Sequence, residues 1–161
     1  MKNTIFNEIL AYAISIGAIA ALWALFFKLA SPKILVEIRA GSISFKSDKA
    51  QITLRPLLYL SKLKKRYRLL SVGEEFCPTE PAIRIDLLNY NGEGGGVKEY
   101  LECVSAFFRH GFSKVTGRKV LVVPKVTIKG AEYIYSNFTE LNDNLFSKAL
   151  KQAGAIECTF A

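Results

Sequence analysis

Residues 34–58 read ILVEIRAGSISFKSDKAQITLRPLL, and apolar and polar side chains alternate along three short runs in this stretch. The runs are Ile34–Ile38, Ser42–Lys46 and Gln51–Leu58, separated by Gly41 and by the Ser-Asp-Lys segment at 47–49. Alternation with a period of two is typical of strands that bury one face. Because the connections are so short, the stretch predicts three consecutive antiparallel strands.

Further elements follow along the chain. Tyr67–Val72 and Ile83–Leu87 are two more candidate strands. In Val97–His110 the apolar residues recur three and four positions apart, which predicts one face of a helix. We expect this helix to end at His110, with Gly111 as its C-terminal cap.

The last third of the chain predicts two more strands and a helix. Lys119–Val123 is an apolar strand closed by Pro124, Leu141–Ala153 is a helix capped by Gly154, and Ala155–Phe160 is a final strand. Both strands look buried on two faces, as parallel strands covered by helices are. The order predicts an α/β fold with a mixed five-stranded sheet flanked by helices, which resembles the ribonuclease H-like and actin-like arrangement.

An uncharged segment of 19 residues, Ile9–Phe27, precedes this domain. As a helix it would be about 28 Å long, close to the thickness of a bilayer core. The sequence therefore predicts a membrane anchor over residues 1–31 and a domain over residues 32–161. A cleaved signal peptide is the rival, but its apolar core would be shorter, and a cut after Ala30 would put Lys28 at −3.

Basic residues follow the apolar segment, with 11 Lys and Arg against two acidic residues from Lys28 to Arg68. By the positive-inside rule, the N-terminus is expected outside and the C-terminal domain in the cytoplasm, at the inner (cytoplasmic) membrane. The densest basic cluster comprises Lys62, Lys64, Lys65, Arg66 and Arg68. It predicts contact with the anionic lipid of the bilayer, with plain solvated surface as the alternative. Nucleic acid is the less favoured ligand, because only Tyr59 and Tyr67 accompany these charges.

Other candidate chemistry is weak. The glycine loop Asn91–Gly96 precedes a helix and could bind an anion, but its spacing matches no phosphate-binding motif, so a simple connection is favoured. His110 is the only histidine, and the three cysteines (Cys77, Cys103, Cys158) have no metal-ligand spacing. The sequence therefore predicts no metal site and no cofactor.

Several short motifs resemble the MreB family of bacterial actins. They include the Arg-Lys-Val-Leu-Val-Val-Pro run at 118–124, Thr127, Ala131-Glu132 and the Ala-Gly-Ala turn at 153–155. Upstream, residues 36–45 stand where that family has its first hairpin, and Ser71–Glu75 resembles the strand after it. The resemblance covers residues 34–161 and only the first actin-type subdomain, for which it implies a ribonuclease H-like fold.

Departures from the family concern its phosphate loop, which would lie at Glu37, Arg39, Gly41 and Ser42. Glu37 replaces the usual Asp, and Arg39 stands where a glycine lets backbone approach the nucleotide. The second phosphate loop of the family is also missing from the sequence. Because phosphoryl transfer needs a nucleotide clamped around a metal, we expect no ATP hydrolysis and no enzyme. A ribonuclease is not expected either, since the fourth strand supplies no carboxylate for a metal pair.

The resemblance therefore implies a non-catalytic, membrane-anchored scaffold or adaptor, resembling a truncated MreB, in cell shape or the organisation of membrane-associated cytoskeletal filaments. Its expected protein partner is a second copy or a full-length actin-type filament. Two alternatives remain: an inert actin-type docking subunit of an envelope machine for secretion or pilus assembly, and a nucleotide-binding actin-like protein.

Overall fold

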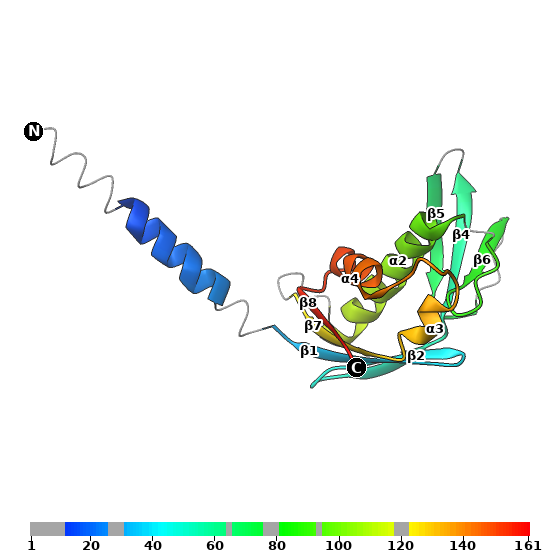
Figure 1. Cartoon of the computed structure of the whole chain (residues 1–161), viewed down its shortest axis with the longest axis horizontal. Helices are drawn as coiled ribbons and strands as arrows, with labels where there is room; N and C mark the ends of the chain where they lie inside the picture. Colours follow the sequence, from blue (N-terminus) through cyan, green and yellow to red (C-terminus); the bar gives the residue numbers. More distant parts are fainter. Residues whose placement is uncertain (1–11, 26–30, 64–65, 76–80, 93–94, 118–122) are drawn as a thin grey trace, which may run out of the picture. The chain divides into compact units, whose positions relative to one another are not determined.

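The computed structural model describes residues 12–25, 31–63, 66–75, 81–92, 95–117 and 123–161 of the chain. The chain divides into two compact units, Met1–Ser31 and Pro32–Ala161. The second unit contains two sheets: a five-stranded sheet with helices on one face, and a separate three-stranded sheet (Figure 1).

The first unit contains one described helix, over residues 12–25. Ile9 and Phe27, the ends of the predicted membrane span, lie outside the described residues. Within the part of the chain that the structure describes, no helix is long and apolar enough to cross a membrane. This finding overturns the predicted transmembrane anchor and the inner-membrane location that followed from it.

The five-stranded sheet has the order β3-β2-β1-β7-β8. Its strands are β1 (Lys33–Arg39), β2 (Ser42–Lys46), β3 (Gln51–Leu54), β7 (Lys125–Lys129) and β8 (Glu157–Phe160). Strands β1, β2 and β3 pair antiparallel, whereas β7 is parallel to both β1 and β8. The predicted mixed five-stranded sheet is therefore confirmed, including its antiparallel first three strands.

The three-stranded sheet has the order β5-β4-β6 and is antiparallel throughout. Its strands are β4 (Leu57–Leu63), β5 (Arg66–Val72) and β6 (Ala82–Asp86). The predicted single strand Gln51–Leu58 is wrong, because the chain leaves the first sheet after Leu54 and enters the second at Leu57. Pro56 lies at this break, where its missing N–H removes a donor that a continuous strand would need.

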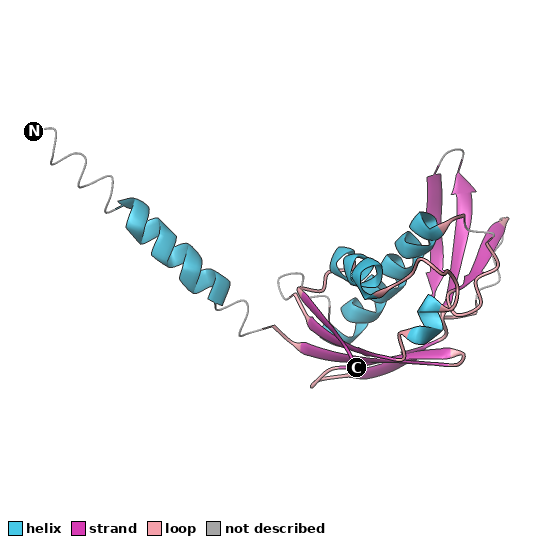
Figure 2. Ribbon diagram, in the orientation of Figure 1, coloured by secondary structure: helices cyan, strands magenta, loops and turns pink. Residues whose placement is uncertain are grey.

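Helices α2 (Val97–Thr116) and α4 (Asp143–Gln152) cover one face of the five-stranded sheet (Figure 2), while α3 (Glu132–Tyr135) is a single turn. The sheet sends Ile34, Val36 and Ile38 of β1 and Phe45 of β2 toward these helices, and all four are buried. Phe45 contacts the rings of Phe107, Phe108 and Phe112 on α2, with centroids 5.6–6.1 Å apart. These aromatic contacts form the centre of the core.

Helix α2 continues past its predicted end. It ends at Thr116 and is capped by Gly117, whose φ of 71° is the left-handed conformation that glycine favours. Gly111 instead lies inside the helix, directly against the sheet. A Cβ at this position would lie 2.4 Å from Cζ of Phe45. The glycine is therefore needed for close approach of the helix to the sheet rather than for a cap, and the predicted cap is wrong.

Strand β7 lies after Pro124, whereas the sequence predicts a strand before it. Of the predicted strand Lys119–Val123, residues 119–122 lie outside the described residues, and Val123 is exposed. In β7 Val126 and Ile128 are buried but Thr127 is only half-buried. The burial predicted for Lys119–Val123 is not tested, because four of its residues lie outside the described ones. In the last strand, β8, Glu157 and Thr159 are exposed, so the burial predicted for that strand on both faces is wrong. The sequence placed the strand before Pro124 because residues 120–123 are all apolar, whereas apolar and polar residues alternate in β7.

Asn137 links three segments that are distant in the sequence. Its Nδ2 donates to Leu87 O (2.8 Å) and Tyr100 Oη (2.9 Å), and its Oδ1 accepts the N–H of Tyr90 (2.9 Å). The rings of Tyr90, Tyr100 and Phe138 pack around it, with centroids 4.9–5.5 Å apart. This network fixes the start of α2 against the end of β6 and the segment between α3 and α4.

We expect Gly111→Ala to lower the free energy of unfolding. Alanine favours a helix by about 0.5–1 kcal/mol, but overpacking a filled core costs about 1–3 kcal/mol, and the buried ring of Phe45 cannot move aside. Urea unfolding should show a net loss of about 1–2 kcal/mol. In a Phe45→Leu background the same change should become neutral or favourable, and an equal loss in both backgrounds would contradict the contact.

Asn137→Ala should also destabilise the protein, by about 2–3 kcal/mol. The change removes the acceptor that Asn137 offers to the Tyr90 N–H and one of two donors to the carbonyl of Leu87, which keeps the hydrogen bond from the Tyr100 hydroxyl. Asn144→Ala, at an exposed position of α4, serves as the matched control and should change stability by less than about 0.5 kcal/mol. Equal unfolding midpoints for the two variants would contradict the assigned role of Asn137.

Candidate functional site

A groove lies between the three-stranded sheet and the N-terminal half of α2, with a volume of about 160 Å³. The sheet side is apolar and is formed by Leu58, Leu60, Tyr67 and Leu69. The helix side is formed by Glu99, Glu102, Cys103 and Ala106. The groove is therefore an apolar surface with two carboxylates along its helix margin.

The sheet side of the groove is covered only in part. Leu58 and Leu60 of β4 are buried in the core, whereas Leu69 and Tyr67 of β5 are 42% and 48% exposed. A register shift between Tyr59 and Leu60 makes Leu60 pair with Leu69. Strand β5 is also at the edge of its sheet. Two large apolar side chains are consequently exposed on a strand that has no neighbour on one side among the described residues. Such an edge is a ready template for another chain.

The helix side carries a buried thiol between two exposed acids. Burial, together with a smaller effect of the nearby carboxylates of Glu102 and Glu99, raises the pKa of Cys103 to about 11. A thiol with this pKa stays protonated at neutral pH, where the thiolate is the reactive form. Cys103 is therefore an apolar lining residue of the groove and is poorly suited to act as a nucleophile.

Glu99 also occupies the N-terminus of α2, where the glycine loop could have bound an anion. Its Oε2 accepts the N–H of Gly96 at 3.1 Å. Gly95 has a φ of 114°, and a Cβ there would lie 2.9 Å from Cγ of Glu99. Residues 93–94 of the loop lie outside the described residues. Because the chain's own carboxylate already binds at this helix end, the loop is suited to capping the helix.

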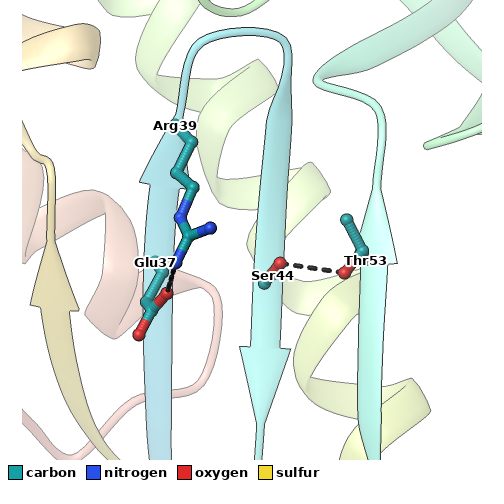
Figure 3. A network of polar contacts seen from close by, with 4 residues as sticks. All are labelled: Glu37, Arg39, Ser44 and Thr53. Atoms are coloured by element: carbon teal, nitrogen blue, oxygen red, sulfur yellow. Dashed lines mark hydrogen bonds and ion pairs between the residues drawn. The ribbon is translucent and has the colours of Figure 1, made fainter.

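The residues predicted at the degraded phosphate loop lie in the hairpin between β1 and β2. Arg39 Nη2 donates to Glu37 Oε2 at 2.7 Å, and Ser44 and Thr53 on the neighbouring strands share a hydrogen bond of 2.9 Å (Figure 3). Arg39 pairs with Ser42 across the turn, and Gly41 adopts a φ of 81°. The guanidinium of Arg39 and the carboxylate of Glu37 thus form an ion pair on the surface of the sheet.

The predicted basic cluster lies at the hairpin between β4 and β5. Leu63 pairs with Arg66, and Ser61 with Arg68. Lys64 and Lys65 lie outside the described residues, and Lys62 is part of β4. Arg68 is exposed, and alternation along β5 places it on the face opposite Tyr67 and Leu69. Among the residues that the structure describes, no group of three His, Cys, Asp or Glu side chains could hold a metal ion.

Sequence reasoning found the strand Tyr67–Val72 but missed the groove. The signal was present in Tyr67 and Leu69, two large apolar residues that alternate with arginines. Their exposure depends on the second sheet, which the sequence did not separate from the first.

A comparison with protein-family models finds no match to this chain, and a comparison with curated proteins finds no significant match.

The raised pKa of Cys103 predicts slow alkylation. At pH 8 the thiolate fraction should be about 100-fold below that of the unfolded chain, and the rate should rise about tenfold per pH unit up to about 11. Iodoacetamide labelling followed by peptide mass spectrometry measures this rate. Leu69→Ala should widen the groove and speed the labelling of Cys103, with Ile156→Ala, another exposed apolar position, as the control. Equal rates in native and unfolded protein would contradict a buried thiol.

Proposed function

We propose that this protein is a non-catalytic scaffold or adaptor that binds another protein chain along β5 and the groove beside α2. The observation that carries the proposal is the exposure of Tyr67 and Leu69 on an edge strand, next to an apolar groove. Large apolar side chains on an unpaired edge favour association with a partner rather than contact with water.

Strand addition suits this surface. A partner segment in an extended conformation would pair its backbone with the free edge of β5 and place alternate side chains against Tyr67 and Leu69. Glu99 and Glu102 along the margin favour a segment that carries lysine or arginine at its outer positions. Main-chain pairing would supply affinity, and the groove would supply selectivity.

The resemblance of the sequence to MreB-type actins suggests which partner to test first. A second copy of this chain or a full-length actin-type filament fits the proposed role. Docking in an envelope machine would use the same surface with a different partner. The Glu37–Arg39 ion pair supports a binding role over nucleotide hydrolysis, because the guanidinium lies where a phosphate loop would need bare backbone.

Leu69→Lys tests the proposal. We expect the purified full-length protein to self-associate in analytical ultracentrifugation or to pellet with MreB-type filaments. The variant should weaken that association about 10–100-fold, since burying one such side chain contributes about 1.5–3 kcal/mol. Ile156→Lys, at an apolar position of similar exposure before β8, should bind like the wild type. Wild-type protein that remains monomeric and stays in the supernatant, or equal losses for both variants, would contradict the proposal.

A further inference from the structure

The second face of the five-stranded sheet differs in character from the face that the helices cover. Helices α2 and α4 cover one face, and no described element of residues 32–161 lies against the other (Figures 1 and 2). Alternation along the strands divides the residues between these faces. The open face holds Lys33, Leu35, Glu37 and Arg39 of β1, Ser44 and Lys46 of β2, Gln51 and Thr53 of β3, Lys125, Thr127 and Lys129 of β7, and Glu157 and Thr159 of β8.

Basic side chains dominate the charge of this face. It carries five basic and two acidic side chains, and both acids are engaged in ion pairs: Glu37 with Arg39 at 2.7 Å and Glu157 with Lys125 at 3.4 Å. Within the described residues, Lys33, Lys46 and Lys129 have no ion-pair partner. Lys33 also stands directly opposite Lys125 in the parallel register, an unfavourable pair of like charges. The face therefore has an excess of positive charge that an anionic ligand would relieve.

The uncharged residues between the lysines are hydrogen-bonding groups. Ser44 pairs with Thr53 and Thr127 pairs with Thr159, and β1 lies between the two pairs. Lysines and hydroxyls together are the side chains that contact phosphate and sugar in nucleic-acid complexes. Five strands about 4.8 Å apart span about 19 Å, enough to reach both phosphate backbones across a minor groove of about 6 Å.

We propose that the open face of the five-stranded sheet binds the phosphate backbone of duplex nucleic acid without sequence preference. Lys33, Lys46 and Lys129 contact phosphates. Thr127 and Thr159 donate to phosphate oxygens, as does whichever hydroxyl of the Ser44–Thr53 pair accepts their shared hydrogen bond. The surface lies on the opposite side of the sheet from α2. It is therefore distinct from the protein-binding groove and does not depend on it.

The composition of the face favours a duplex over other polyanions. Single strands bind by stacking bases on aromatic rings, and the described residues of this face include none. Membrane surfaces hold proteins through apolar side chains as well as charge, and Leu35 is the only large apolar side chain among the described residues of the face. Binding to the phosphate backbone of a duplex requires neither aromatic rings nor an apolar protein surface.

The salt dependence of binding tests the proposal. Fluorescence anisotropy would follow the full-length protein on a labelled 16-base-pair duplex of arbitrary sequence between 50 and 200 mM KCl. Three phosphate contacts predict a slope of about −2.7 in log K against log [salt], an affinity loss of about 40-fold over this range. Lys33→Gln, Lys46→Gln or Lys129→Gln should each reduce the slope by about 0.9, leaving a loss of about 12-fold.

Lys148→Gln, at an exposed position of α4 on the helix side of the sheet, is the matched control and should leave the slope unchanged. Leu69→Lys should not weaken duplex binding either, which separates this proposal from the protein-binding groove. Three results would overturn it: no binding at 50 mM KCl, a slope that Lys148→Gln changes as much as the sheet variants do, or tighter binding to phosphatidylserine vesicles than to the duplex.

Discussion

The contact between α2 and the five-stranded sheet at Gly111 and Phe45 determines where the other parts of the domain lie. Because position 111 has no side chain, α2 comes close to the ring of Phe45 on β2. This ring also packs against three phenylalanines of α2. The helix is thereby held on the sheet along its C-terminal half. Asn137 holds the N-terminal half against the end of β6. A helix fixed at both ends cannot shift to cover the whole three-stranded sheet.

Two surfaces of different character follow from that placement. Beside the N-terminal half of α2, β5 keeps Tyr67 and Leu69 exposed next to two carboxylates, which suits a basic segment of a partner protein. The far face of the five-stranded sheet is polar and basic, with three lysines that have no ion-pair partner among the described residues.

Sequence patterns predicted the parts of this fold that depend on local periodicity. The alternation in residues 34–54 predicted β1, β2 and β3, and helical spacing after Val97 predicted the start of α2. Gly111 was misread as a cap because a glycine needed for close packing has the same sequence signature as one that ends a helix. The Arg55-Pro56 break and β7 were missed because sheet membership is decided by distant pairing. The apolar segment before the domain predicted a membrane helix that the described residues do not contain. The position of the groove could not be predicted, since it depends on how the three-stranded sheet meets α2.

The central claim is that β5 presents an open apolar surface beside α2. Solvent paramagnetic relaxation enhancement of the leucine methyl groups in the free full-length protein tests it most directly. The account predicts strong enhancement for Leu69 and weak enhancement for Leu58 and Leu60, which lie on the same sheet face but are buried. Protection of the Leu69 methyl groups equal to that of Leu60 would mean that the groove is closed, and it would contradict the account.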